Sequence, residues 1–102
     1  MLEPAQITYQ VTEALEKIGT TYFIGGSLAS TFYGLVRTTQ DSDIVTMLKQ
    51  EQVPMLVELL SGDFYVDDLS IYDAIQHQSS FNIIHRESLF KVDLFIPPLR
   101  LF

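Results

Sequence analysis

The chain has 102 residues, a length that supports one domain with one hydrophobic core, and 47% of its residues are hydrophobic. The net charge of -7 and the scattered lysines and arginines argue against a general nucleic-acid surface. No apolar run approaches the ~20 residues that span a bilayer, and the absence of cysteine excludes disulfides and thiolate metal sites. We therefore expect a single cytoplasmic domain without a membrane partner.

The first part of the chain predicts a helix, a strand and a second helix. Apolar residues recur at helical spacing between residues 4 and 19, at Ile7, Val11, Ala14, Leu15 and Ile18. Residues 21–24 (TYFI) are β-branched or aromatic and predict a buried strand, which Gly25 and Gly26 would end. Ser27 can cap a further helix over residues 28–34.

The remaining elements complete a mixed α/β pattern. In chain order they are a strand at 42–48, a helix at 49–61, a weak strand at 63–66, a helix begun by Ser70, and a hairpin of 81–85 and 89–96 around the turn 86–88. This order favours an α/β (α+β) fold with a mixed sheet and with helices mainly on one face.

A glycine pair stands between the first strand and the second helix. Gly25 and Gly26 allow the backbone to approach a ligand closely, and a helix that starts after them offers free N–H groups to a phosphate. Ser27 could add a hydroxyl. The alternative is a tight turn followed by a capping serine, which needs no ligand.

Asp41 and Asp43 open the second strand with one serine between them. Alternate residues of a strand point to the same face, so both carboxylates should project together. Carboxylate oxygens suit Mg²⁺, which prefers a few such ligands plus phosphate oxygens. A polar loop with a turn aspartate is the competing interpretation.

Asp93 lies within the apolar run of the last strand, where aspartate is disfavoured. The alternative explanation is an edge strand on which Asp93 faces water beside Lys91. Arg37 could pair with a phosphate or with Asp41, or it could be a cation of a surface loop. His77 and His85 lack a metal-ligand spacing, and we expect them at surface or turn positions.

Together, the strand, the Gly-Gly-Ser turn, the helix, the paired acids and the later strand aspartate resemble the DNA polymerase β-like nucleotidyltransferase superfamily. The resemblance covers residues 22–96, and "GLVRTTQDSDIV" is similar to the small bacterial and archaeal members. It implies that Gly25, Gly26, Ser27 and Arg37 bind the nucleotide. It also implies that Asp41, Asp43 and Asp93 form a catalytic, two-metal Mg²⁺ site.

The resemblance implies an Mg²⁺-dependent nucleotidyltransferase that moves a nucleoside monophosphate from an NTP to a hydroxyl. The acceptor could be a partner protein, as in small antitoxin-type transferases paired with a helical toxin, a small molecule, or RNA, which the acidic charge disfavours. The alternative is a catalytically weak or inactive nucleotide- or partner-binding module of the same fold, such as an antitoxin. A homo-oligomer is also open.

Two features depart from the family pattern. Ser42 stands between the paired acids where relatives usually carry an apolar residue. The chain also ends soon after Asp93, whereas many relatives continue with helices that grip the base or the acceptor. We therefore expect residues 1–102 to form either a minimal domain completed by a partner chain or a domain that lacks a C-terminal helical part.

Overall fold

The structure is a computed structural model, which describes residues 4–24 and 41–98 without the side chains of Asp41 and Ser42. The described elements are α1 (Pro4–Lys17), β1 (Tyr22–Ile24), β2 (Asp41–Thr46), a 3₁₀ turn η1 (Gln50–Gln52), α3 (Val53–Leu60), β3 (Phe64–Tyr65), α4 (Asp68–His77), β4 (Ser80–His85) and β5 (Lys91–Phe95). Each corresponds to an element predicted from the sequence. The expected helix over 28–34 lies outside the described residues. No helix among those described is long and apolar enough to cross a membrane.

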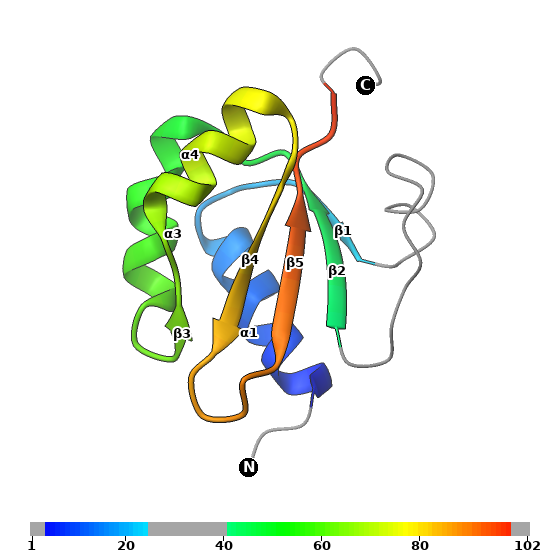
Figure 1. Cartoon of the computed structure of the whole chain (residues 1–102), viewed down its shortest axis with the longest axis vertical. Helices are drawn as coiled ribbons and strands as arrows, with labels where there is room; N and C mark the ends of the chain where they lie inside the picture. The colour runs from blue at the N-terminus through cyan, green and yellow to red at the C-terminus, as the bar shows by residue number, and fades with distance from the viewer. Residues whose placement is uncertain (1–3, 25–40, 99–102) are drawn as a thin grey trace.

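The strands form one five-stranded mixed sheet in the order β1-β2-β5-β4-β3. Strands β2 and β5 are parallel, and the other neighbouring pairs are antiparallel. Strand β5 therefore lies at the centre of the sheet, between β2 and β4 (Figure 1). The mixed sheet predicted from the sequence is confirmed, and the fold is a small α+β domain.

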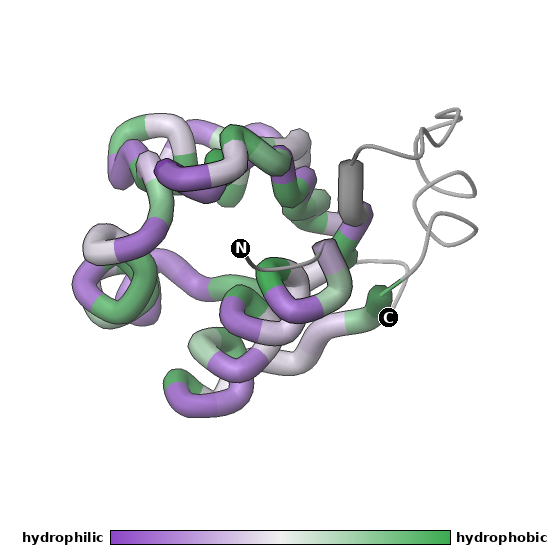
Figure 2. Tube along the Cα trace, turned by 90° about the horizontal axis from the view of Figure 1, so that it is seen from below, coloured by the Kyte–Doolittle hydropathy of each residue, from purple (hydrophilic) through white to green (hydrophobic). Residues whose placement is uncertain are grey.

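The hydrophobic core joins the three described helices to one face of this sheet. Because neighbouring strands pair in register, their inward residues line up, as Ile44, Leu94 and Phe81 do across β2, β5 and β4. The same cluster of buried side chains includes residues of all three helices, among them Leu15 of α1 and Leu56 of α3. Figure 1 shows α1 behind the central strands, and in Figure 2 each helical coil carries both hydrophilic and hydrophobic residues. These helices therefore cover one sheet face with their apolar sides.

The opposite sheet face carries the alternate strand positions. Val45 and Phe95 are paired across β2 and β5, and both are buried although neither belongs to the core cluster. Asp43 and Asp93 occupy the same face, two residues earlier on each strand. We call this surface the carboxylate face.

Helix α1 ends in a backbone arrangement that requires glycine. Gly19 has a φ of +78°, which L-residues with a side chain rarely adopt. The amide of Gly19 donates to the carbonyl of Glu16, and the amide of Thr20 donates to that of Leu15. These two bonds satisfy carbonyls that the helix end would leave unpaired, and they turn the chain toward β1.

Two local predictions from the sequence are wrong. Strand β1 is an edge strand, and Phe23 and Ile24 are 41% and 56% exposed, so the TYFI segment is not a buried strand. Helix α4 starts at Asp68 rather than at Ser70. Asp67 is its N-cap, because its carboxylate accepts from the Leu69 amide at 3.2 Å and from the Ser70 hydroxyl at 2.8 Å.

The connection between β4 and β5 is longer than the predicted turn at 86–88. The His85 amide donates to the Phe90 carbonyl at 2.9 Å, and the Leu89 amide donates to the His85 carbonyl at 2.7 Å. Residues 86–89 therefore form the turn, and Leu89 takes a left-handed conformation with a φ of +62°. The one-residue difference decides which residues face each other across the two strands.

One ionisable contact joins α1 to β1 and gives a pH prediction. The Tyr22 hydroxyl donates a 2.6 Å hydrogen bond to Glu16 Oε2, and this bond, together with burial, raises the pKa of Tyr22 above its ordinary value of 10.0. The folded state thus holds the phenolic proton more tightly than the unfolded state. The stabilisation is complete below pH 10 and is lost as the pH rises through the raised pKa.

We expect an ultraviolet titration of phenolate absorbance to show a raised pKa for Tyr22, and this transition should be missing from Tyr22→Phe. In Glu16→Gln, the pKa of Tyr22 should fall toward its ordinary value. A Tyr22 pKa that is the same in the wild type and in Glu16→Gln would show that this hydrogen bond does not control the titration.

Candidate functional site

Two aspartates meet at the centre of the carboxylate face. Asp43 of β2 is the register partner of Asp93 of β5, and the two strands run parallel. Residues paired in register project from the same face of a sheet, and neighbouring strands are about 4.8 Å apart. The sequence separates these two carboxyl groups by fifty positions, and the sheet places them on adjacent strands.

The pair lies in a partly buried part of the sheet. Asp43 is 8% exposed and Asp93 is half-buried. Like charges opposite each other on neighbouring strands destabilise a sheet, and burial increases the effect because the dielectric constant is lower. Both residues also make further interactions in the protein.

The edge-strand explanation of Asp93 is wrong. Strand β5 is central and hydrogen-bonded on both sides, to β2 and to β4. Aspartate is a poor strand former, and nothing about a central strand requires it. Asp93 therefore needs another reason for its position.

The other residues of the predicted site are only partly within the described chain. Asp41 starts β2 and pairs in register with Lys91, two residues before the Asp43–Asp93 pair, but its side chain is outside the described part. Gly25, Gly26, Ser27 and Arg37 lie outside the described residues altogether. The predicted phosphate turn begins directly after Ile24, the last residue of β1, which neighbours β2 in the sheet.

The described carboxylates are of the ligand type that a divalent cation takes. Within residues 4–24 and 41–98, no group of three or more His, Cys, Asp or Glu side chains is close enough to hold a metal ion. That search does not include the side chain of Asp41, the third predicted ligand. The two remaining carboxylates offer hard oxygen donors side by side, which is the ligand type that Mg²⁺ takes together with phosphate oxygens.

Asn82 was missed by the sequence analysis. It lies on β4 directly opposite Asp93, so Asn82, Asp93 and Asp43 form one row across three adjacent strands. Its amide can donate to a carboxylate or to a substrate oxygen. The hairpin register was the signal that could have identified it, but a turn at 86–88 would have paired Asp93 with Phe81 instead.

The histidines lie away from this row. His77 is exposed, as expected, with Nδ1 3.1 Å from Asp73 Oδ1. His85 is buried, which contradicts the prediction of a surface or turn position. Its ring packs edge-on against Phe64 at 5.3 Å between centroids, and its Nδ1 lies 2.9 Å from the Ser88 hydroxyl. His85 thus supports the β4–β5 turn from the core side.

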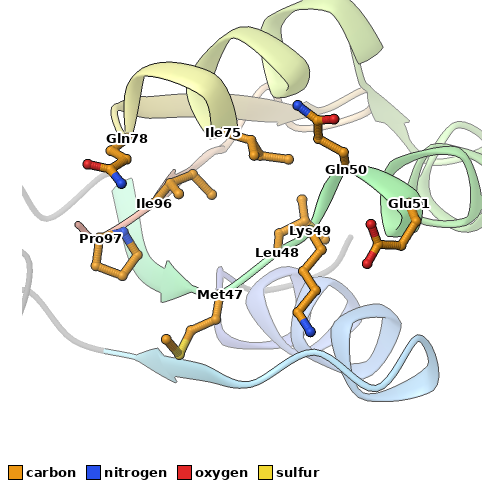
Figure 3. Close-up of a pocket in the computed structure, with 9 residues that line it drawn as sticks. All are labelled: Met47, Leu48, Lys49, Gln50, Glu51, Ile75, Gln78, Ile96 and Pro97. Atoms are coloured by element: carbon orange, nitrogen blue, oxygen red, sulfur yellow. The ribbon is translucent and has the colours of Figure 1, made fainter. Parts of the chain in front are cut away.

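Among the cavities that the described residues form, one lies at an end of the sheet and one adjoins the aspartate row. One, of about 390 Å³, opens where β2 and β5 end, and its walls are mainly apolar (Figure 3). It is lined by Leu48, Ile75, Ile96 and Pro97, with Lys49 and Glu51 among its polar residues. This cavity does not include the aspartate row. A second cavity, of about 310 Å³, includes Asn82 and therefore adjoins the row on the β4 side.

No family model matches the chain, and comparisons with curated proteins and with solved structures also found no match. The function proposed for this protein therefore depends on its own residues and on their arrangement.

Proposed function

We propose that the protein is an Mg²⁺-dependent nucleotidyltransferase, which moves a nucleoside monophosphate from an NTP to a hydroxyl of a second molecule. The observation that carries this proposal is the register pairing of Asp43 with Asp93 on the sheet face opposite the one that the described helices cover. Like charges directly opposite each other on neighbouring strands are unfavourable by themselves, and a pair of carboxylates is the kind of ligand that Mg²⁺ would take together with phosphate oxygens.

The residues have distinct roles in this proposal. Asp41, Asp43 and Asp93 would hold the Mg²⁺ ions, and Gly25, Gly26, Ser27 and Arg37 would hold the triphosphate, as the family resemblance implies. Bound Mg²⁺ would supply charge stabilisation for the phosphate oxygens. The chain itself positions the two substrates, which is the main contribution of a protein to transfer at phosphorus.

The proposed reaction is an in-line displacement. The hydroxyl oxygen of the acceptor forms a bond to the α-phosphorus, while the bond from that phosphorus to the bridging β-phosphate oxygen breaks. Pyrophosphate leaves with the bonding electrons, and the hydroxyl proton passes to a carboxylate oxygen of Asp93. The partly buried position of Asp93, beside Asp43, suits a group that accepts a proton at the reacting centre.

The experiment that tests this proposal uses each of the four NTPs labelled at the α-phosphate, with Mg²⁺ and a panel of hydroxyl acceptors. We expect label to move to an acceptor with release of pyrophosphate, and chelation of the metal should stop the transfer. Calorimetric binding of an NTP without transfer to any acceptor would favour the non-catalytic nucleotide-binding module. Absence of binding by every NTP would contradict both functions.

A further inference from the structure

The carboxylate face has two sides, one toward β1 and one toward β4 and β3. The predicted phosphate turn follows β1, which lies at one edge of the sheet beside β2. Strands β4 and β3 lie on the other side of Asp93. In-line transfer requires the attacking oxygen and the leaving pyrophosphate on opposite sides of the phosphorus. If the triphosphate lies toward β1, the acceptor must therefore approach over β4 and β3.

A cavity of about 310 Å³ lies on that side. Its floor includes Asn82 and Ile84 of β4 and Tyr65 of β3, which pairs in register with Ile84. Asn82 and Ile84 share the sheet face of Asp93, because Asn82 pairs with Asp93 and Ile84 pairs with Lys91. We call this cavity the sheet-face pocket. It adjoins the reacting carboxylate through Asn82.

The far end of the sheet-face pocket carries a fixed positive charge. The Arg86 guanidinium lies 4.5 Å from the centre of the Tyr65 ring, and its Nε and Nη2 donate to the Ser61 carbonyl at 3.1 and 2.9 Å. Among the described residues, Arg86 has no carboxylate partner within ion-pair distance. Asp67, in the same pocket, accepts instead from the Leu69 amide and the Ser70 hydroxyl.

Two contacts hold the guanidinium in place, and its other N–H groups remain available as donors to an anion. A donor that is already positioned loses little entropy when a ligand binds. Arginine also recognises carboxylate and phosphate groups through two parallel hydrogen bonds.

The pocket is therefore ordered along β4. A polar amide stands next to Asp93 at Asn82, an apolar and aromatic surface follows at Ile84 and Tyr65, and a cation stands at Arg86. A two-residue step along a strand is about 6.6 Å, and the Arg86 guanidinium lies over Tyr65, the register partner of Ile84. The amide of Asn82 and this cation are therefore roughly one such step apart along the strand, which is about the length of a small ring compound with a polar group at each end.

We propose that the sheet-face pocket binds the acceptor of the transfer reaction, and that this acceptor is a hydroxy acid with a flat or apolar ring. Its hydroxyl lies at Asn82 beside Asp93, its ring lies on Ile84 next to the stacked Arg86 and Tyr65 side chains, and its anionic group pairs with Arg86. This inference rests on the proposed function, since it names the substrate class of the same site. Asn82 positions the hydroxyl, whose oxygen then bonds to the α-phosphorus as described above.

The test uses 4-hydroxybenzoate as the probe, with the full chain and without nucleotide or metal. We expect the NMR signals of Tyr65, Asn82 and Ile84 to shift on titration. Benzoate, which keeps the anion, should bind comparably, and phenol, which lacks it, should bind at least tenfold more weakly. Arg86→Gln should weaken 4-hydroxybenzoate about tenfold or more, because a charged hydrogen-bonded pair is lost.

Control variants separate this effect from general changes in charge or folding. Lys49→Gln removes the same charge from an exposed lysine that lines the other cavity, and it should bind the probe as the wild type does. Arg86→Lys keeps the charge but not the planar fork, and its affinity should lie between those of the wild type and Arg86→Gln. Unchanged amide spectra outside the pocket show that each variant is folded.

The outcomes distinguish this inference from the proposed function. Signals of the pocket residues that do not move, or equal affinity in Arg86→Gln, would overturn the pocket as the hydroxy-acid site. Transfer to another acceptor with an unchanged KM in Arg86→Gln would overturn the inference while the transferase activity stands. If the probe binds but no acceptor receives label, the proposed function fails and the acceptor role fails with it. Label on the probe hydroxyl, with a KM raised in Arg86→Gln, would support both.

Discussion

Asp93→Asn is expected to lower the rate of nucleotidyl transfer by about a thousandfold. The substitution keeps the size of the side chain and removes both a metal-binding charge and the acceptor of the hydroxyl proton. Loss of several kcal/mol of transition-state stabilisation from a metal site corresponds to about three powers of ten in rate. Asp43→Asn should have an effect of the same order, because Asp43 is the register partner of Asp93.

The measurement is the initial rate of label transfer from the preferred NTP at saturating Mg²⁺. Glu58→Gln is the matched control, since it also replaces one carboxylate by an amide but lies exposed on α3. We expect Glu58→Gln to react at the wild-type rate. Transfer by Asp93→Asn at the wild-type rate would show that Asp93 neither holds the metal nor accepts the proton.

Magnesium should stabilise the wild-type protein against unfolding, and Asp43→Asn and Asp93→Asn should each remove that stabilisation. A ligand that binds only the folded state contributes about 2.7 kcal/mol at one hundred times its dissociation constant. Without metal, Asp43→Asn should instead be more stable than the wild type by roughly 0.2–1 kcal/mol, because the repulsion between paired like charges is relieved. The order of stability of the two proteins should therefore reverse when Mg²⁺ is added.

Chemical denaturation with and without Mg²⁺ gives these free energies of unfolding. Glu58→Gln should gain as much stability from Mg²⁺ as the wild type does, which excludes a general effect of ionic strength on an acidic chain. Equal stabilisation of Asp43→Asn and the wild type by Mg²⁺ would place the bound metal elsewhere. A metal-free Asp43→Asn less stable than the wild type would show that the repulsion between the two carboxylates is already compensated within the protein.

The sequence predicted which helices and strands exist better than it predicted where they begin and how deeply they are buried. The spacing of apolar residues was enough to predict α1, α3 and the two strands of the β4–β5 hairpin, because a helix or strand that is buried on one side carries apolar residues at regular intervals. The start of α4 was wrong because Asp67, rather than Ser70, supplies the capping oxygen. The burial of β1 was wrong because composition alone does not say which strand lies at a sheet edge.

The candidate site shows the same limit. The sequence could indicate Asp43 and Asp93 as unusual strand acids, but only the parallel pairing of β2 and β5 makes them neighbours. Asn82 and Arg86 could not be found in this way, because the register of the hairpin depends on one extra turn residue, Leu89, in a left-handed conformation. A shift of one residue moves every side chain of a strand to the other face.

The central claim is that Asp43 and Asp93 bind a divalent metal ion. Mn²⁺, a paramagnetic substitute for Mg²⁺, broadens the NMR signals of nearby amides, and it can be titrated in with the NTP present. We predict that the signals of Asp43, Asp93 and Asn82 broaden first, and that Asp93→Asn abolishes this at the same Mn²⁺ concentration. First broadening at the exposed acids Asp68 and Asp73 of α4, with sharp signals for Asp43 and Asp93, would contradict the account.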